Sequence, residues 1–311
     1  MLHLRLIVPV DLVPAVMAFL EAAPEVTNLW TLPGGAVKPA GDVVSCDVAK
    51  EEGSTVLERL RGLGLDHRGS IAVEVVDASV SDVARAAEVA APGSPADAVV
   101  WEEVEDRLFE SATLSVSFLV LITIATMIAA IGIITDSIVL IIGAMVVGPE
   151  FGPLAGFSVA LSEGRPELAK RSLAALAVGF PAGTLAACIL TIVLVAVSVA
   201  PDELVPTEHE LTLFISQPNW YSVIIAVLAG IAGMLALVSG KAGPLIGVLI
   251  SVTTIPSAAN VGVAVAYGSW DEALRAAGHL GINVVAIVTS GLLVLRVARR
   301  ARTHRTGFVR R

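Results

Sequence analysis

The sequence predicts an α-helical integral membrane protein in which six transmembrane helices, arranged as two inverted three-helix repeats, follow a small α+β domain. Of the 311 residues, 55% are hydrophobic and only 16% are charged, and the mean hydropathy of +0.83 is far above that of a soluble protein. Nearly all the long apolar runs lie in the part of the chain between Leu114 and Val297. That part also contains an internal repeat.

Residues 1–78 have the mixed composition of a soluble domain. Four segments rich in β-branched residues predict strands, and two segments with apolar residues at helical spacing predict helices, in the order β-α-β-β-α-β. This order predicts a ferredoxin-like domain, one antiparallel sheet with both helices on one face, which we expect to lie in the cytoplasm. Its sequence shows no phosphate-binding loop or catalytic pair, and we expect His3 and His67 to be isolated histidines at the surface or at strand ends.

Residues 79–113 are predicted to connect this domain to the membrane. Their first part is rich in Ala, Ser, Pro and Asp, which is typical of a linker with room for one short helix. The second part has the pattern of an amphipathic helix that enters the bilayer, with Trp101 and Phe109 placed to meet the interface. Cys46 and Cys188 lie in different parts of the chain and lack the spacing of a disulfide framework or a zinc site.

Six candidate spans lie in residues 114–297, and each is long enough to cross about 30 Å of hydrocarbon. They are residues 114–134, 138–161, 173–199, 221–238, 244–267 and 277–295. Apart from Arg275, the basic residues between and after the spans fall in loops on one side and in the Arg-rich tail, residues 298–311. By the positive-inside rule, this pattern places both termini in the cytoplasm. We therefore predict a multi-pass protein of the inner (plasma) membrane and no nucleic-acid partner, despite that basic tail.

The internal repeat appears when the chain is shifted by 104 positions. Gly143 then falls on Gly247, Gly164 on Gly268 and Arg171 on Arg275. The repeats span residues 114–199 and 221–297, with three candidate spans in each. Because three is odd, the second copy must enter the membrane upside down, which is the inverted-repeat arrangement of many transporters.

Two spans at equivalent places in the repeats contain helix-breaking residues. The second span has Gly148, Pro149, Gly152 and Pro153, and the fifth has Pro256. Each proline removes a backbone donor, and hydrocarbon cannot satisfy the carbonyl that is released. We therefore predict that both spans are interrupted, with their broken backbone facing protein or water.

An ionisable residue and several polar residues accompany these breaks. Glu150 lies near the centre of the second span, and Thr254 occupies the equivalent position in the fifth. Thr253, Ser257 and Asn260 add hydroxyl and amide groups nearby. Ionisable residues inside a membrane are by default functional, so these five residues are the predicted binding site for a small cation or a proton-coupled solute.

A structural interpretation of the same residues stays open, because prolines often only kink membrane helices and hydroxyls rescue their carbonyls. Asp136 and His279 are weaker site candidates, since both are predicted near the external ends of spans where water reaches them. The segment around Pro181 is predicted to be a kink or a packing groove. The small residues Ala229, Gly233 and Ala236 predict a helix–helix contact.

The stretch IGAMVVGPEFGP, with IGAM at 142–145 followed by Pro149 and Pro153, and the later stretch GVLISVTTIPSAANVGVAV resemble the bacterial and archaeal membrane family of the uncharacterised hydrophobic domain, domain of unknown function 389. The similarity covers residues 111–295. The chain departs from it by placing Glu150 where many members have apolar residues. The resemblance implies a six-span domain after a cytoplasmic module, and no established substrate, cofactor or catalytic residue.

From these patterns we expect a transporter or channel-like protein for a small ion or solute, with its pathway between the second and fifth spans. We expect the N-terminal domain to regulate or assemble it, the lipid bilayer and further copies of the chain to be its partners, and no cofactor to be needed. The alternative is a membrane-anchored signalling or scaffold protein. An enzyme is not expected, because His279 and Glu150 alone do not form a hydrolytic set.

Overall fold

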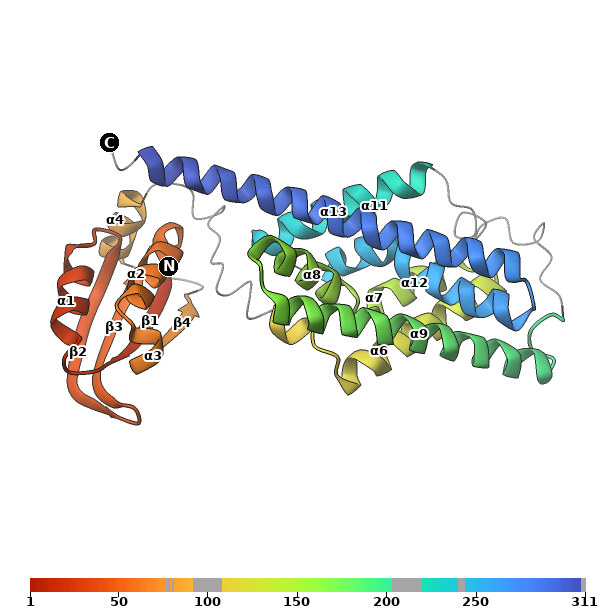
Figure 1. The fold of residues 1–311 in the computed structure, drawn as a ribbon, viewed down its shortest axis with the longest axis horizontal. Helices are drawn as coiled ribbons and strands as arrows, with labels where there is room; N and C mark the ends of the chain where they lie inside the picture. Colours follow the sequence, from red (N-terminus) through yellow and green to blue (C-terminus); the bar gives the residue numbers. More distant parts are fainter. Residues whose placement is uncertain (77–78, 80, 92–107, 203–219, 240–243, 309–311) are drawn as a thin grey trace. The chain divides into compact units, whose positions relative to one another are not determined.

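The computed structural model describes residues 1–76, 79, 81–91, 108–202, 220–239 and 244–308, and for residues 244–253 and 299–308 it describes the backbone alone. The chain divides into two compact units, Met1–Glu103 and Val104–Arg311 (Figure 1).

The first unit contains a four-stranded antiparallel sheet with the strand order β2-β3-β1-β4. The strands are β1 (Leu2–Val8), β2 (Val26–Val37), β3 (Ala40–Val48) and β4 (Ser70–Val75). Helix α1 (Val13–Ala22) connects β1 to β2, and α2 (Gly53–Gly62) with the short α3 (Leu65–Arg68) connects β3 to β4. A further helix, α4 (Asp82–Ala90), lies in the segment predicted as a linker. Trp101 lies outside the described residues.

The core of the first unit follows from the alternation of apolar residues along β1. Leu2, Leu4, Leu6 and Val8 point to one face of the sheet and are fully buried. Residues of α1 and α2 complete this core, among them Val16, Leu20, Val56, Leu57 and Leu60. The intervening residues of β1, such as His3 and Arg5, lie on the other face of the sheet.

The second unit is helical. Its elements are α6 (Val116–Ile134), α7 (Ile138–Val147), α8 (Phe151–Glu163), α9 (Pro166–Ala196), α11 (Trp220–Val238), α12 (Pro244–Ala266) and α13 (Trp270–Phe308). Four described helices, α6, α9, α11 and α13, are long and apolar enough to cross a membrane, and α7 with α8 forms a bent pair that gives up to a fifth span. The chain is therefore a multi-pass membrane protein. Only the backbone of residues 244–253 is described, so α12, which corresponds to the predicted fifth span, is not among these helices.

Two helices begin earlier than the predicted spans. α9 begins at Pro166 and α13 at Trp270, although the predicted spans begin at residues 173 and 277. Each helix starts just after a glycine with positive φ, Gly164 or Gly268, where the chain reverses. Each has acidic residues in its first turn, which the helix dipole favours. The polar segments predicted as loops before these two spans are therefore largely the first turns of α9 and α13.

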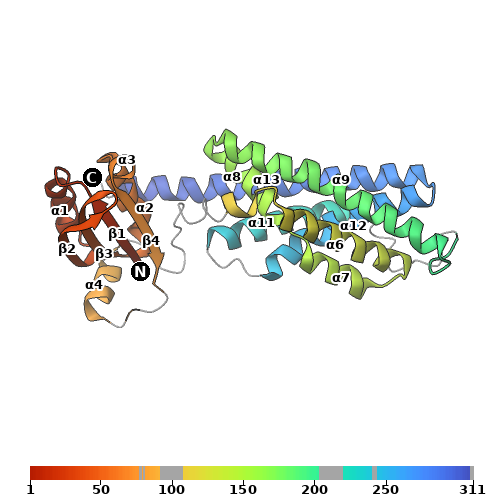
Figure 2. The same cartoon turned by 90° about the horizontal axis from the view of Figure 1, so that it is seen from below.

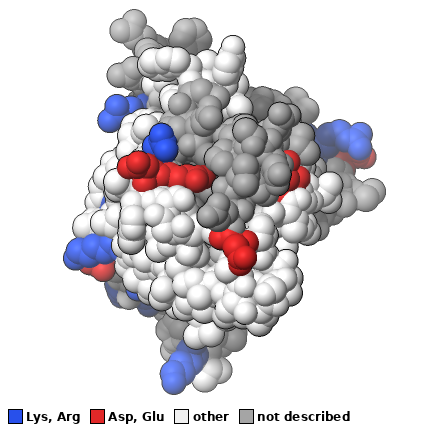
Figure 3. All heavy atoms as spheres, turned by 90° about the vertical axis from the view of Figure 1, so that its right-hand side faces the viewer, with Lys and Arg blue, Asp and Glu red and all other residues white. Residues whose placement is uncertain are grey.

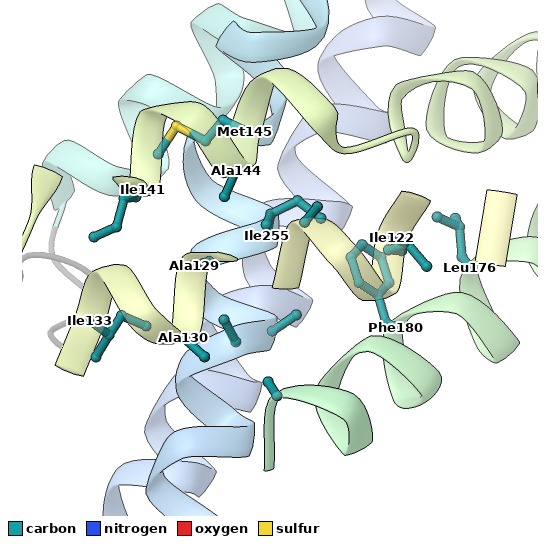
Figure 4. Packing of buried hydrophobic residues seen from close by; sticks show 14 of the residues in the cluster. Ile122, Ala129, Ala130, Ile133, Ile141, Ala144, Met145, Leu176, Phe180 and Ile255 are labelled. Carbon is teal, nitrogen blue, oxygen red and sulfur yellow. The ribbon is translucent and has the colours of Figure 1, made fainter. Parts of the chain in front are cut away.

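The helices pack around a continuous apolar core. Figure 4 shows Ile255 of α12 between Ala144 of α7 and Ala129 of α6, and these three residues are fully buried. Figures 1 and 2 show α13 running along the unit beside α11 and α12. α9 continues through Pro181, and its Gly179 and Gly183 allow α6 to approach closely: an added Cβ would lie 2.6 Å from the Phe118 ring and 2.9 Å from Thr126. This segment is a packing surface.

The outer faces of the long helices carry large apolar side chains. Examples are Val120 and Ile124 on α6, Leu185 and Ile189 on α9, Leu228 and Leu235 on α11, and Val285 and Leu293 on α13, each more than 40% exposed. Contiguous apolar surface of this kind is stable only when lipid or protein covers it. The four helices therefore contact the lipid bilayer through these faces.

Candidate functional site

The second predicted span is interrupted, as its Gly and Pro residues predict. α7 ends at Val147 with Gly148 as its C-cap, and α8 begins at Phe151, so the two helices are bent by 53°. Pro149 lies in the gap, where no helical hydrogen bond is lost. Gly152 and Pro153 belong to the first turn of α8 instead of the break, because a proline is tolerated where the backbone N–H has no helical acceptor.

The prediction that Pro256 breaks the fifth span is wrong. α12 is one continuous helix from Pro244 to Ala266 with Pro256 inside it. A proline removes a single hydrogen bond, and packing against neighbouring helices can hold the remaining turns together. Ile255, Ala258 and Ala259 around it are fully buried, and α12 contacts α6, α7, α9 and α13.

Glu150 occupies the break between α7 and α8. It is the N-cap residue of α8 and is fully buried. Its Oε1 accepts a hydrogen bond of 2.9 Å from the hydroxyl of Thr254 on α12. Gly148 makes room for this carboxylate, because a Cβ at that position would overlap Glu150 Oε2 and lie 2.9 Å from Ile255 Cγ1. The break therefore holds a carboxylate directly against α12.

A row of buried polar groups continues from Glu150 along α12. Thr254, Ser257 and Asn260 are three residues apart, so they lie on the same side of the helix, and each is at most 1% exposed. Each has a partner on another helix or at its cap. Ser257 Oγ lies 3.3 Å from Nδ1 of His279, and Asn260 Nδ2 donates to Glu272 Oε1 at 3.4 Å.

We call this set the polar row: Glu150, Thr254, Ser257, His279, Asn260 and Glu272. It contains four of the five predicted site residues; the side chain of the fifth, Thr253, lies outside the described part of α12. At about 1.5 Å of rise per residue, Thr254 and Asn260 are about 9 Å apart along the helix. The row ends at Glu272, which is partly exposed in the first turn of α13.

His279 is more deeply buried than its position in the sequence predicts. It was predicted to lie near a water-accessible span end, but it is 3% exposed and contacts Ser257. The reason is that α13 begins at Trp270, which puts His279 more than two turns inside the helix. Asn283, four residues later on the same side, is fully buried, and this spacing of two polar residues in an apolar segment is the signal that could have found the site. Asp136 lies in the turn between α6 and α7.

In the first unit, the prediction that His3 is isolated is wrong. Its Nδ1 lies 2.7 Å from Asp47 Oδ1, and its Nε2 lies 3.0 Å from Ser45 Oγ. Asn28 Nδ2 donates to the other oxygen of Asp47 at 2.6 Å. His67, in contrast, is 85% exposed, as predicted for a surface histidine.

The sequence of contacts from Ser45 through His3 to Asp47 has the order of a hydrolytic triad. The serine, however, is 1% exposed and its hydroxyl donates to the carbonyl of Leu4 at 3.2 Å. A nucleophile must reach its substrate, so this arrangement is better suited to joining β1, β2 and β3 than to catalysis. In the part of the chain that the structure describes, no three His, Cys, Asp or Glu residues could hold a metal ion.

Comparison with known proteins places the polar row inside a recognised domain. The sequence matches the family "Domain of unknown function (DUF389)" over residues 145–289. It is 26% identical over 204 residues to an uncharacterized protein of Methanocaldococcus jannaschii, an alignment that covers 63% of this chain and 58% of that protein. The chain thus spans less than two thirds of that relative. No solved structure matches the chain.

Proposed function

We propose that the chain, which matches the DUF389 family over residues 145–289, is a membrane transporter or channel-like protein for a small ion or solute, whose pathway passes between the α7–α8 break and α12. The observation that carries the proposal is Glu150, a fully buried carboxylate at that break which bonds to Thr254. Ionisable side chains inside a membrane are costly, and they generally mark ion pathways and proton relays.

Two inverted repeats of three spans form the framework of the proposed pathway, and the helix bounds support them. Adding 104 to the first and last residue numbers of α6 gives those of α11. α9 and α13 also begin 104 residues apart, each after a glycine of positive φ. At both junctions the same backbone bond recurs, from Arg165 N to Ala160 O and from Ser269 N to Ala264 O.

Contacts between the proposed repeats come in reciprocal pairs, which also supports the arrangement. Ser158 Oγ of α8 donates to the carbonyl of Val288 in α13 at 3.5 Å. The equivalent positions in the 104-residue register are Gly262 of α12 and Thr184 of α9. Here a Cβ added to Gly262 would overlap the carbonyl of Thr184, so the two backbones meet at the same place.

The contact between Glu150 and Thr254 joins equivalent positions of the two proposed repeats. The two residues are 104 apart, so each occupies the position of the other in the repeat. Residues exchanged by a two-fold axis can touch one another only close to that axis. Transporters built from inverted repeats place their binding sites at this interface, near the middle of the membrane. The N-terminal end of α8 adds a positive potential that favours a carboxylate there.

The proposed orientation places both termini and the basic turn between α8 and α9 in the cytoplasm, and the turn between α12 and α13 outside. Arg165, Lys170 and Arg171 lie at the first turn, and Asp271 and Glu272 lie at the second. Figure 3 views the end of the membrane unit that carries the second turn, where acidic atoms and a few basic ones lie among uncharged atoms. An acidic entrance attracts cations. The ferredoxin-like N-terminal domain regulates or assembles the membrane unit, as a homo-oligomer in the plasma membrane.

The second candidate function is a membrane-anchored signalling or scaffold protein. Trp30 and Leu32 on β2 are each 52% exposed, which favours a protein partner for the first unit. The two candidates differ in one respect: a scaffold needs no path through the bilayer, and a carboxylate at residue 150 would then serve packing alone.

Flux through purified protein in liposomes tests the proposal. Glu150→Gln keeps the shape of the side chain and removes its charge, so we expect it to abolish the flux of protons or alkali cations. Glu167→Gln makes the same chemical change at a residue that is 72% exposed at the start of α9, and we expect it to retain wild-type flux. Wild-type flux through Glu150→Gln, or no flux of any small ion or solute through the wild type, would refute the transport proposal.

A further inference from the structure

We propose that the polar row is a proton path to Glu150 that opens from one side of the membrane only, at the turn between α12 and α13. The inference rests on the proposed transport function and deepens it, since it names the proton as the species that reaches Glu150 and the side from which it arrives. Three observations support it: the chemistry of the row, its burial and its absence from the equivalent half of the other repeat.

The chemistry of the row suits proton transfer. Imidazole can take a proton on one ring nitrogen and release one from the other, so His279 can accept a proton from the outer turn at Nε2 and pass one from Nδ1 to Ser257 Oγ. Thr254 is one turn from Ser257 on the same helix, a separation of about 5–6 Å between Cβ atoms, and its hydroxyl already donates to Glu150 Oε1. The carboxylate of Glu150 ends the path by accepting the proton and becoming a neutral acid.

Burial favours a proton over a hydrated cation. Glu150, Thr254, Ser257 and Asn260 are at most 1% exposed and His279 is 3% exposed. A hydrated ion needs space around it, whereas a proton needs only groups that come within hydrogen-bond range of one another. Glu272 is partly exposed and receives a hydrogen bond from Asn260, so these two residues form the entrance of the path.

The equivalent positions of the other repeat lack this chemistry. Subtracting 104 from Ser257, Asn260, Glu272 and His279 gives Pro153, Gly156, Leu168 and Ala175. These four residues cannot exchange protons. The space is also filled, because a Cβ added to Gly156 would lie 2.8 Å from Ser172 Oγ and 2.9 Å from Ala112 Cβ. The asymmetry lies in the sequence and persists in any conformation.

The ionisable groups near His279 are few. α12 has none between Thr254 and Ala266, and α11 has only Tyr221, which is 75% exposed. α8 contributes Glu150 at its N-cap and Glu163 at its other end. α13 itself contributes Asp271, Glu272 and Arg275 near its first turns. Carboxylates therefore lie at both ends of the path.

The experiment measures protonation of Glu150 directly, by the infrared absorption of its protonated carboxyl group in proteoliposomes of one orientation, assigned with Glu150→Gln. A pH change on the α12–α13 side is expected to alter this absorption in the wild type, and the same change on the other side to act at least about tenfold more slowly. Ser257→Ala and His279→Gln should each slow the response to the first side by about tenfold or more, and Ser257→Thr, which keeps the hydroxyl, should restore it.

Ser172→Ala is the matched control, since it removes a fully buried hydroxyl from the equivalent half of the unit and should leave the rate unchanged. Equal responses from both sides, or wild-type rates in both Ser257→Ala and His279→Gln, would overturn the proton path. Those results would leave the transport proposal intact if ion flux still required Glu150. Conversely, absent flux with one-sided protonation of Glu150 would refute transport and keep the path.

Discussion

Replacing Gly148 by alanine tests whether the break between α7 and α8 exists to hold the carboxylate of Glu150. Gly148 has a φ of −61°, which any residue adopts, so the backbone itself does not oppose the change. The added Cβ would overlap Glu150 Oε2, lie 2.9 Å from Ile255 Cγ1 and lie 3.2 Å from Glu150 Cδ. The carboxylate or α12 must therefore move.

The cost follows from that crowding. Ile255 and Glu150 are both fully buried, so neither can swing into open space. Overpacking a buried site costs about 1–3 kcal/mol, which lowers the ratio of folded to unfolded protein by about 5-fold to 150-fold. We expect Gly148→Ala to lose this much stability and to weaken the contact between Glu150 and Thr254.

Gly143→Ala is the control on the same helix. A Cβ at Gly143 meets nothing within 4 Å, and alanine is favoured over glycine inside a helix by about 0.5–1 kcal/mol. The assay is reversible unfolding of the purified protein in mixed micelles, followed by circular dichroism, with both variants measured beside the wild type. If Gly148→Ala is as stable as Gly143→Ala, the carboxylate is not confined as the structure places it.

Three further changes have defined outcomes. Thr254→Val removes the donor to the buried Oε1 of Glu150 and should cost about 1–3 kcal/mol in the same unfolding assay, whereas Thr191→Val, whose hydroxyl bonds only its own helix, should cost less. His3→Ala leaves Ser45 and Asp47 without a shared partner and should destabilise the first unit by about 1–3 kcal/mol, while His67→Ala at the surface should be neutral in thermal melts; equal effects would contradict the assigned network. Burial, with Asp47 nearby, raises the pKa of the Cys46 thiol to about 12. The unfolded chain loses this proton above about pH 8.5 and the folded one does not, so stability should fall as pH rises from about 8.5 towards 12, and this slope should be smaller in Cys46→Ala.

The sequence predicts the features that depend on local pattern or on the proposed repeat. Alternation in β1 predicts its buried face, and the 104-residue register places Thr254 opposite Glu150. Features that depend on packing were missed. The effect of Pro256 on α12 is decided by the helices packed around it, which local sequence does not reveal.

The surroundings of two histidines were predicted wrongly, for different reasons. His3 has partners 42 and 44 residues away, and only the register between β1 and β3 brings them together. His279 depends on where α13 begins, and span prediction from hydropathy excludes the polar first turns of a helix. The partners of His3 thus depend on strand pairing, and the burial of His279 depends on the helix bounds.

The pairing of Glu150 with Thr254 has a consequence for how such a chain could arise. On the proposed repeat, two separate copies of one half would bring identical side chains together on their axis. Two glutamates there would repel each other, and two threonines would carry no charge. Joining the halves in a single polypeptide lets the two positions diverge, so that one supplies the acid and the other the hydroxyl that holds it. Divergence of the two halves would then be a condition for this centre to have a single charge.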